Sequence, residues 1–206
     1  MSFSFKTGRP LYATVVSMRK IIVSEFITLD GVMQDPGGSK EIPRGGWNLP
    51  FMNEEAGQYK VDELLAADAL LLGRVTYQAF AEFWPTANMG AFSDQINSMK
   101  KYVVSSTLTD EDLIWNNTTQ IKHDVVAGLK KLKQSAGGPI LVNGSAQLVQ
   151  TLIQNDLVDE YRLQLHPIIL GEGKRLFNEG LDQKTLGLVE TRALNNGLLL
   201  LTYKPN

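Results

Sequence analysis

The sequence predicts an α/β fold with a mixed, mainly parallel central sheet flanked by helices and an antiparallel hairpin at the C-terminal end. Three observations lead to this prediction. Apolar, β-rich segments alternate with amphipathic ones, as in repeated strand–helix units. Polar, glycine-containing junctions follow several apolar segments. Near the C-terminal end, two apolar segments flank Asn195-Asn196-Gly197, and Asn-Gly is the strongest short hairpin signal.

The first half of the chain is expected to begin with a buried strand at residues 21–27, because this segment is mostly apolar and rich in β-formers. Asp30-Gly31 ends that strand in a turn, and residues 34–50 form a long loop with four glycines and three prolines. Asn53 is the expected N-cap of the first helix. The remaining elements expected here are this helix to about residue 66, a strand at 68–72, helices at 73–84 and 91–99, and a strand at 102–105.

The second half is expected to continue the alternation of strands and helices. A helix at 123–134 has its apolar residues on one face, and Gly137-Gly138-Pro139 ends it. The other elements expected here are strands at 114–121, 140–142, 158–165 and 168–170, a helix at 146–155, and hairpin strands at 186–194 and 198–203.

Composition excludes several classes of site. The chain has 206 residues, which suits one compact domain, and its net charge of −2 without a basic block argues against a nucleic-acid surface. The absence of cysteine excludes disulfides and Cys-based metal sites, and it fits a cytoplasmic location. His123 and His166 are far apart, so no metal site is predicted. No apolar segment is long enough for a transmembrane helix.

The N-terminal residues are expected to lie outside the folded domain. Residues 1–17 read as a flexible extension, and residues 18–206 as the domain. The apolar run at residues 11–16 is too short for a good secretion signal, so that alternative is less favoured.

Three junctions after predicted strands carry residues suited to a phosphate-containing ligand, because ligands bind at the carboxyl ends of parallel strands. Gly73-Arg74-Val75-Thr76 combines a small residue, a guanidinium and a hydroxyl next to a helix start. Ser105-Ser106 offers two hydroxyls. Asn143-Gly144-Ser145-Ala146 precedes a helix and can cradle a pyrophosphate. Each junction is also explained by ordinary turn and cap formation, and no Rossmann or P-loop glycine motif is present.

Residues 18 to the C-terminus resemble the dihydrofolate-reductase-like superfamily. Within it the chain is most similar to bacterial proteins that resemble the C-terminal reductase domain of the bifunctional riboflavin-biosynthesis deaminase/reductase. The resemblance depends on an ordered set of five short stretches. These are Thr28-Leu29-Asp30-Gly31, Leu72-Gly73-Arg74-Val75-Thr76-Tyr77, Val104-Ser105-Ser106, Val142-Asn143-Gly144-Ser145 and Pro167-Ile168-Ile169-Leu170-Gly171-Glu172-Gly173.

The resemblance implies a homodimer that binds NADPH and a small-molecule substrate. Arg74 is then a candidate for the 2′-phosphate, and Asp30-Gly31 lies beside the nicotinamide. Trp47, in its glycine-rich loop, is a candidate to cover the substrate. The implied cofactor-binding residues are Gly73, Arg74, Thr76, Ser105, Ser106, Asn143, Gly144, Ser145, Ala146 and Gln147, and the implied substrate-binding residues are Trp47, Pro167, Leu170 and Gly171.

The resemblance also implies the reaction: hydride transfer from NADPH to a small heterocycle. The substrate would be a pterin or a riboflavin-precursor pyrimidine, as for 5-amino-6-(5-phosphoribosylamino)uracil reductase. Met52 stands where dihydrofolate reductases carry a substrate-binding carboxylate, and no zinc-binding deaminase domain precedes the reductase, so neither parent reaction is assigned. The alternative is a non-catalytic NADPH-binding homodimeric module.

The proton donor of this reaction is left open among a few carboxyl groups and water. Asp30 and Glu54 are the predicted catalytic residues, with Glu55 a further candidate. Each also has a structural explanation, because Asp-Gly is a common turn and acidic residues favour the first turn of a helix.

Overall fold

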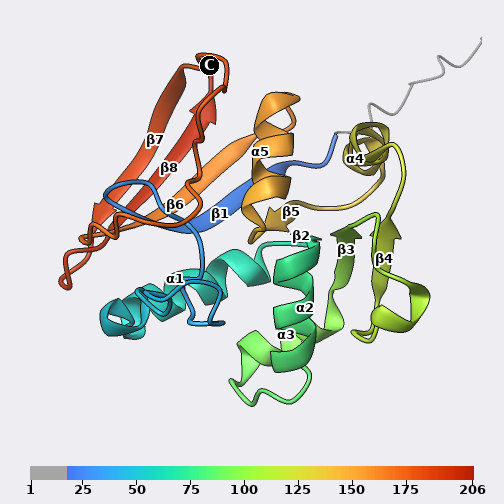
Figure 1. Cartoon of the computed structure of the whole chain (residues 1–206), viewed down its shortest axis with the longest axis horizontal. Helices are drawn as coiled ribbons and strands as arrows, with labels where there is room; N and C mark the ends of the chain where they lie inside the picture. The colour runs from blue at the N-terminus through green and yellow to red at the C-terminus, as the bar shows by residue number, and fades with distance from the viewer. Residues whose placement is uncertain (1–17) are drawn as a thin grey trace, which may run out of the picture.

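The computed structural model describes residues 18–206, and the predicted extension at residues 1–17 lies outside them. An eight-stranded sheet with the order β4-β3-β2-β5-β1-β6-β8-β7 forms its centre (Figure 1). All neighbouring pairs from β4 to β6 are parallel, and both pairs that involve β8 are antiparallel. The predicted mixed, mainly parallel sheet with a C-terminal hairpin is therefore confirmed.

The central strands are almost entirely buried because helices cover both faces of this part of the sheet. The outer hairpin strand is mostly exposed instead. The strands are β1 (Ile21–Thr28), β2 (Ala69–Gly73), β3 (Lys100–Val104), β4 (Thr118–Ile121), β5 (Ile140–Val142), β6 (Glu160–His166), β7 (Leu186–Ala193) and β8 (Leu199–Pro205).

The helices begin and end close to their predicted positions. Asn53 caps the first one, as expected, by accepting a 2.8 Å hydrogen bond from the Ala56 backbone N–H. The α-helices are α1 (Glu54–Leu65), α2 (Arg74–Phe83), α3 (Ala91–Ser98), α4 (Val125–Gln134) and α5 (Ala146–Gln154). Short 3₁₀ turns occur at Leu49–Phe51 and Asp110–Asp112.

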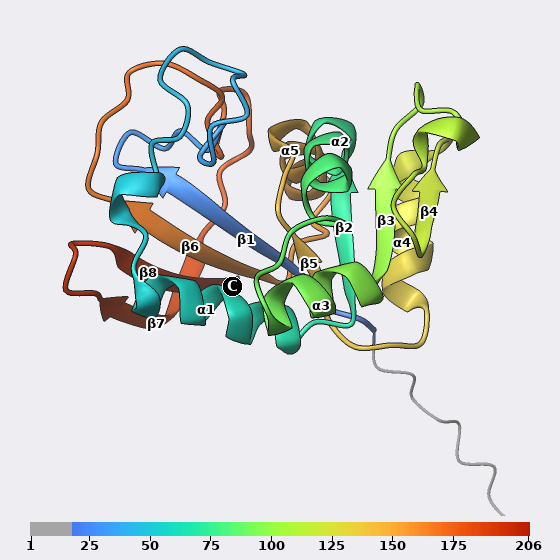
Figure 2. The same ribbon diagram turned by 90° about the horizontal axis from the view of Figure 1, so that it is seen from below.

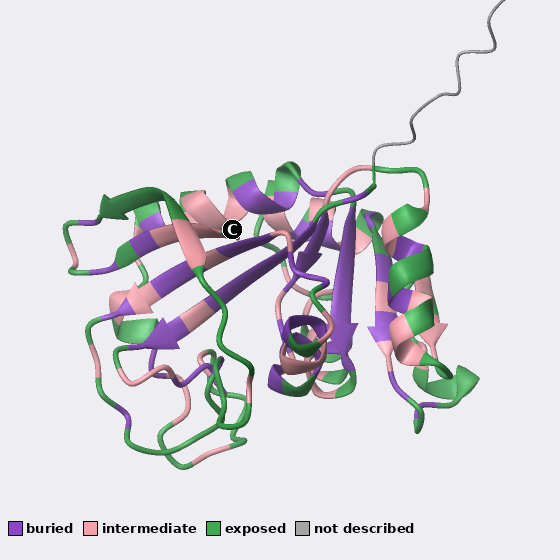
Figure 3. Cartoon of the chain, turned by 90° about the horizontal axis from the view of Figure 1, so that it is seen from above, coloured by how far each residue is buried: buried purple, intermediate pink, exposed green. Residues whose placement is uncertain are grey.

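The helices form two layers, with α1, α2 and α3 on one face of the sheet and α4 and α5 on the other (Figures 1 and 2). Each layer buries its own apolar cluster. Leu129, Val149 and Leu152 pack on one face, whereas Leu64 and Tyr77 pack on the opposite one. Figure 3 shows the resulting buried band along the central strands. In residues 18–206 no helix is both long and apolar enough to cross a membrane.

The predicted strand at residues 168–170 is wrong, because this segment is part of a long loop after β6. Pro167 provides no N–H for a strand ladder. The backbone N–H groups of Leu170 and Gly171 donate instead to the carboxylate of Asp30, at 3.1 and 2.8 Å. A side chain thus replaces the neighbouring strand that this apolar segment would need.

Candidate active site

The three polar junctions lie at the same edge of the sheet. β2 ends at Gly73, which pairs in register with Val104 at the end of β3. β5 ends at Val142, which pairs with Leu71 on one side and Val23 on the other. All these strands run parallel, so the segments that follow them emerge together, as predicted for a ligand site in an α/β sheet.

The first and third junctions are in direct contact. The Gly73 backbone N–H donates to the Gly144 carbonyl at 3.0 Å. A Cβ on Gly144 would lie 2.7 Å from Thr76 Oγ1, and a Cβ on Gly73 would collide with the Ser145 side chain. Gly144 also has a φ of +94°, which side chains disfavour. Glycine is therefore required at both positions for the two loops to meet.

Two helix N-termini at this contact have free donors. Gly73 is the N-cap of α2 and Ser145 the N-cap of α5, and neither helix has a side-chain hydrogen bond at its cap. Neither first turn contains an acidic residue. Unsatisfied N–H groups and the positive end of each helix dipole favour an anionic group here.

The side chains beside these N-termini differ in accessibility. Arg74 is exposed, and its Nη1 donates to Gln78 Oε1 on the next turn of α2, at 2.9 Å. Gln147 is exposed as well, whereas Ala146 is 7% exposed and packs into the core. Arg74 is therefore free to rotate toward a bound anion without breaking a core contact.

The two serines of the second junction have different environments. Ser105 is buried, and its hydroxyl accepts hydrogen bonds from the backbone N–H groups of Thr107 and Leu108, both at 3.1 Å. Ser106 is exposed. The Ser105 hydroxyl thus shapes the turn after β3, and Ser106 is the one whose side chain is accessible to a ligand.

Asp30 is held in place by several hydrogen bonds. Its carboxylate accepts a 2.6 Å hydrogen bond from the Thr28 hydroxyl, in addition to those from the Leu170 and Gly171 N–H groups. These hydrogen bonds, that from Thr28 foremost, lower the pKa of Asp30 to about 2. Asp30 thus connects two loops, and its lowered pKa disfavours proton donation, so its catalytic role stays a prediction.

Glu54 and Glu55 lie in the first turn of α1, and both are exposed. They line an open hollow of about 530 Å³ together with Arg192 and Asn195 of the C-terminal hairpin. Glu55 pairs with Arg192 at 3.4 Å. The structure therefore places both carboxylates beside the hairpin, and a role of Glu54 in proton transfer stays a prediction.

A carboxyl group that sequence reasoning missed lies next to the Gly144 loop. Glu25 in β1 is 8% exposed, and its Oε1 has no hydrogen-bond partner within residues 18–206. Desolvation by burial is the largest influence and raises the pKa of Glu25 to about 8, against the opposing charge of Lys60 and the nearby Gly144 backbone, which both lower it. Glu25 is thus a neutral carboxylic acid at pH 7.

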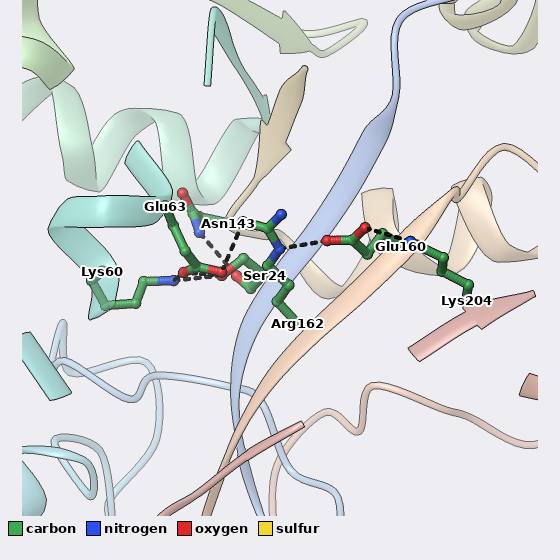
Figure 4. A network of polar contacts seen from close by, with 7 residues as sticks. All are labelled: Ser24, Lys60, Glu63, Asn143, Glu160, Arg162 and Lys204. Carbon is green, nitrogen blue, oxygen red and sulfur yellow. Dashed lines mark hydrogen bonds and ion pairs between the residues drawn. The ribbon is translucent and has the colours of Figure 1, made fainter. Parts of the chain in front are cut away.

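A polar network joins the third junction to α1 (Figure 4). The Asn143 amide donates to the Ser24 carbonyl at 2.9 Å, and the Ser24 hydroxyl donates to Glu63 at 2.8 Å. Lys60 pairs with Glu63 at 2.8 Å and donates to the same hydroxyl. Arg162 of β6 continues the network from Glu63 toward Glu160. The network holds the Asn143 loop against β1 and places an ammonium group beside it.

The predicted substrate residues separate into two places. Trp47 and Leu170 share one apolar cluster with Val32, and Trp47 Nε1 donates to the Gln34 carbonyl at 2.8 Å. Gly171 is exposed beside Asp30, whereas Pro167 packs near Gly197 in the hairpin turn. The structure therefore brings Trp47 and Leu170 together but leaves Pro167 outside their cluster.

Comparison with known families gives one match over most of the chain. Residues 19–200 match the model of the RibD C-terminal domain. A curated relative, the uncharacterized protein YyaP of Bacillus subtilis (strain 168), is 31% identical over 195 residues, which cover 93% of this chain and 97% of the relative.

Solved structures show the same fold at low sequence identity. The RibD protein of Acinetobacter baumannii aligns with a TM-score of 0.66 and 16% identity, over 92% of this chain and 58% of that protein. Dihydrofolate reductase from Enterococcus faecalis, solved in complex with NADP(H) and RAB-propyl, aligns with a TM-score of 0.58 and 16% identity, over 91% of this chain and 96% of that one. These likenesses establish the dihydrofolate-reductase-like fold.

Proposed function

The chain belongs to the RibD C-terminal domain family, an oxidoreductase family, and on that premise we propose that it is an NADPH-dependent reductase acting on a small heterocyclic substrate. The proposed substrate is of the pterin or riboflavin-precursor pyrimidine type. Membership of the family supports the class of reaction, and the geometry at the carboxyl edge of the sheet supports the cofactor.

The observation that carries the proposal is the contact between Gly73 and Gly144, where two helix N-termini with free N–H groups meet. A dinucleotide carries a pyrophosphate, and two adjacent N-termini suit its two charges. Exposed Arg74 beside them suits a further phosphate, as on the ribose of NADPH. The two N-termini and the guanidinium support binding of a cofactor with a pyrophosphate and a further phosphate.

When bound, NADPH supplies the hydride. The residues of this chain position the reactants and donate the proton. The Asn143 amide fixes the loop against Ser24, so that the floor of the site is rigid. Reduction of a C=N or C=C bond also consumes a proton, and a carboxylic acid that is neutral at pH 7 can donate it. Glu25 is such an acid, and the Lys60 ammonium lies near the same strand.

The proposed homodimer is supported by the edge of the sheet. Among residues 18–206, β7 pairs only with β8, and its Leu188 and Val189 are 55% and 53% exposed. An exposed edge strand with apolar side chains favours pairing with a second copy. Light scattering coupled to size-exclusion chromatography would measure the mass, and a monomer at micromolar concentration would contradict this part of the proposal.

The cofactor proposal is tested by titration of the protein with NADPH and NADH, followed by tryptophan fluorescence. We expect NADPH to bind more tightly than NADH and Arg74→Ala to remove most of the difference, by roughly 10-fold or more for a lost charge-assisted contact. Arg192→Ala, which removes an exposed arginine of β7, is the matched control.

Absence of binding by either nucleotide would contradict the cofactor proposal. NADPH binding with no oxidation of the cofactor in the presence of any pterin or pyrimidine tested would instead favour the alternative, a non-catalytic NADPH-binding module.

A further inference from the structure

Gln164 in β6 has a side-chain amide that nothing in the structure explains. The residue is 1% exposed, and within residues 18–206 neither its Oε1 nor its Nε2 has a hydrogen-bond partner. Burial of an unpaired donor and an unpaired acceptor in one side chain is unfavourable, and such groups are rare in folded proteins. A buried amide that the protein itself does not satisfy is available to a ligand.

The strand register places this amide beside the polar network. Gln164 pairs with Phe26 of β1 and with Leu200 of β8. Strand alternation puts it on the same face of β6 as Arg162, two residues earlier, which belongs to the network of Figure 4. Lys60 Nζ lies 5.3 Å from the centre of the Phe26 ring. The amide therefore shares a face of the sheet with Lys60 and with an aromatic ring.

Helix α1 is open where it passes this face. Gly57 lies one helical turn before Lys60, and a Cβ at Gly57 would meet no atom within 4 Å. A glycine inside a helix lowers helix stability, and no crowding requires it at this position. The absent side chain leaves room beside Lys60 for the edge of a planar ligand.

The loop between β1 and α1 covers the same face near the end of β6. His166 also lies on this face of β6, two residues after Gln164. The Trp47 ring meets the His166 ring edge-on, with their centroids 5.1 Å apart. Trp47 belongs to the long segment between β1 and α1, which has no helix or strand apart from the short turn at Leu49–Phe51. Because Gln164 is buried, access of a ligand to this face requires displacement of this loop.

We propose that the Gln164 amide recognises the lactam edge of the substrate, the adjacent ring N–H and C=O of a planar heterocycle, with Lys60 and Phe26 lining the same subsite. The inference rests on the proposed reductase function and names the feature by which the substrate is selected. Gln164 Oε1 accepts from the ring N–H, and Gln164 Nε2 donates to the ring carbonyl, so two hydrogen bonds satisfy both unpaired atoms.

The chemistry of the side chain narrows the class of substrate. A carboxylate at this position would accept from ring N–H groups but would repel a ring carbonyl. A carboxamide provides one donor and one acceptor side by side, which matches a lactam. Because the amide is buried, an analogue without the N–H leaves Oε1 unpaired in the complex and is rejected strongly.

The experiment compares lumazine, a pteridine-dione with lactam edges, with its N,N-dimethyl derivative, which keeps the ring and both carbonyls but has no lactam N–H. Binding to the wild-type protein is measured by calorimetry, with and without saturating NADP⁺. We expect lumazine to bind the wild type at least ~100-fold more tightly than the dimethyl derivative. Gln164→Leu should lose this preference while NADPH binding stays within about 2-fold of wild type.

Thermal unfolding gives a second, independent readout. Removal of an unpaired buried amide should leave the melting temperature of Gln164→Leu unchanged or raise it, whereas removal of a structural amide would lower it. Gln154→Leu, the same change at an exposed position of α5, is the matched control and should alter neither binding nor preference.

The inference is overturned if wild-type protein binds no lumazine, if it binds both probes equally, or if Gln164→Leu keeps the preference. The cofactor titration separates this failure from failure of the proposed function. A protein that binds lumazine through Gln164 but binds no NADPH refutes the reductase proposal alone. A protein that binds NADPH but binds lumazine no more tightly than the dimethyl derivative refutes the Gln164 assignment alone.

Discussion

Glu25 and Asp30 lie five residues apart on one segment of chain, yet their environments drive their carboxyl groups in opposite directions. Glu25 is buried in β1 with one oxygen unpaired, and its pKa rises to about 8. Asp30 follows in the turn after β1, where three donors bind its carboxylate and its pKa falls to about 2. At pH 7 the first is an acid that can give up a proton, and the second is a fixed negative charge.

The difference shows that desolvation and hydrogen bonding, rather than residue type, decide the role of a carboxyl group. Asp30 is visible in the sequence because Asp-Gly marks a turn, and its function in the structure is to hold Leu170 and Gly171 in place. Glu25 forms no recognisable motif, and it is the group that lies next to the Gly144 loop.

The largest expected effect comes from removal of the acidic proton. Glu25→Gln keeps the shape of the side chain but cannot donate a proton as a carboxylic acid does, so turnover should fall by on the order of 100-fold or more. NADPH binding should remain, which titration would verify. Initial rates with a reducible pterin or pyrimidine measure the effect.

Glu82→Gln is the matched control, because it makes the same change at an exposed position near the C-terminal end of α2. It should leave the rate within about 2-fold of wild type. If Glu54→Gln slowed turnover and Glu25→Gln did not, Glu54 rather than Glu25 would be the proton donor.

A second pair of variants compares Gly144, which lies beside Glu25, with Gly171, which lies beside Asp30. Gly144 and Gly171 both have positive φ, +94° and +80°, but only Gly144 is crowded, by Thr76 Oγ1. Gly144→Ala should therefore weaken NADPH binding by roughly 10-fold or more and lower stability, because backbone strain and a collision add together. Gly171→Ala carries the strain alone, so fluorescence titration should show nearly wild-type affinity.

The third prediction concerns stability against pH. Between pH 4.5 and about 8 the folded protein keeps the Glu25 proton that the unfolded chain has lost, so stability falls as pH rises through this range. The loss should amount to a few kcal/mol for a shift of this size. Urea unfolding at pH 5 and pH 8 should show a smaller loss of unfolding free energy in Glu25→Gln than in wild type. An equal loss in both proteins would contradict the raised pKa.

The smallest effect is expected for Asp30→Asn. The amide still accepts one or two of the three hydrogen bonds, so the free energy of unfolding at pH 7 should fall by no more than about 1 kcal/mol. The lowered pKa means that wild type loses this advantage as pH falls from about 4 toward 2, where the two proteins should converge. Urea unfolding over this range measures the convergence, and a constant difference would argue against stabilisation by these hydrogen bonds.

Sequence patterns predicted most of the fold because its strands and helices have strong local signals. The N-cap at Asn53 and the junction glycines Gly73 and Gly144 are required by backbone geometry, which sequence reports directly. Residues 168–170 were wrongly predicted to form a strand, because an apolar run does not reveal that the Leu170 N–H binds a side chain 140 positions away. Glu25 and Gln164 were missed for a related reason, since burial without a partner is a property of the folded environment.

For Glu25 one signal was available: it is a charged residue in an otherwise apolar strand segment, Ile-Ile-Val-Ser-Glu-Phe-Ile. A charge there has to be solvated, paired or neutralised, and the last of these outcomes creates an acid. No comparable signal marks Gln164, because polar residues alternate along β6 as they do in many half-covered strands.

The central position of β1 also determines how late in folding the site can form. Ile21 pairs with Ile140, and Ile22 with Glu160, so the first strand of the domain finds its neighbours only among residues more than a hundred positions later. On a ribosome β1 therefore waits unpaired until β5 and β6 have emerged, a pattern of distant contacts that slows folding and favours chaperone contact. The carboxyl edge of the sheet is assembled late, and a chain truncated before β6 lacks the strand that pairs with β1 and carries Gln164.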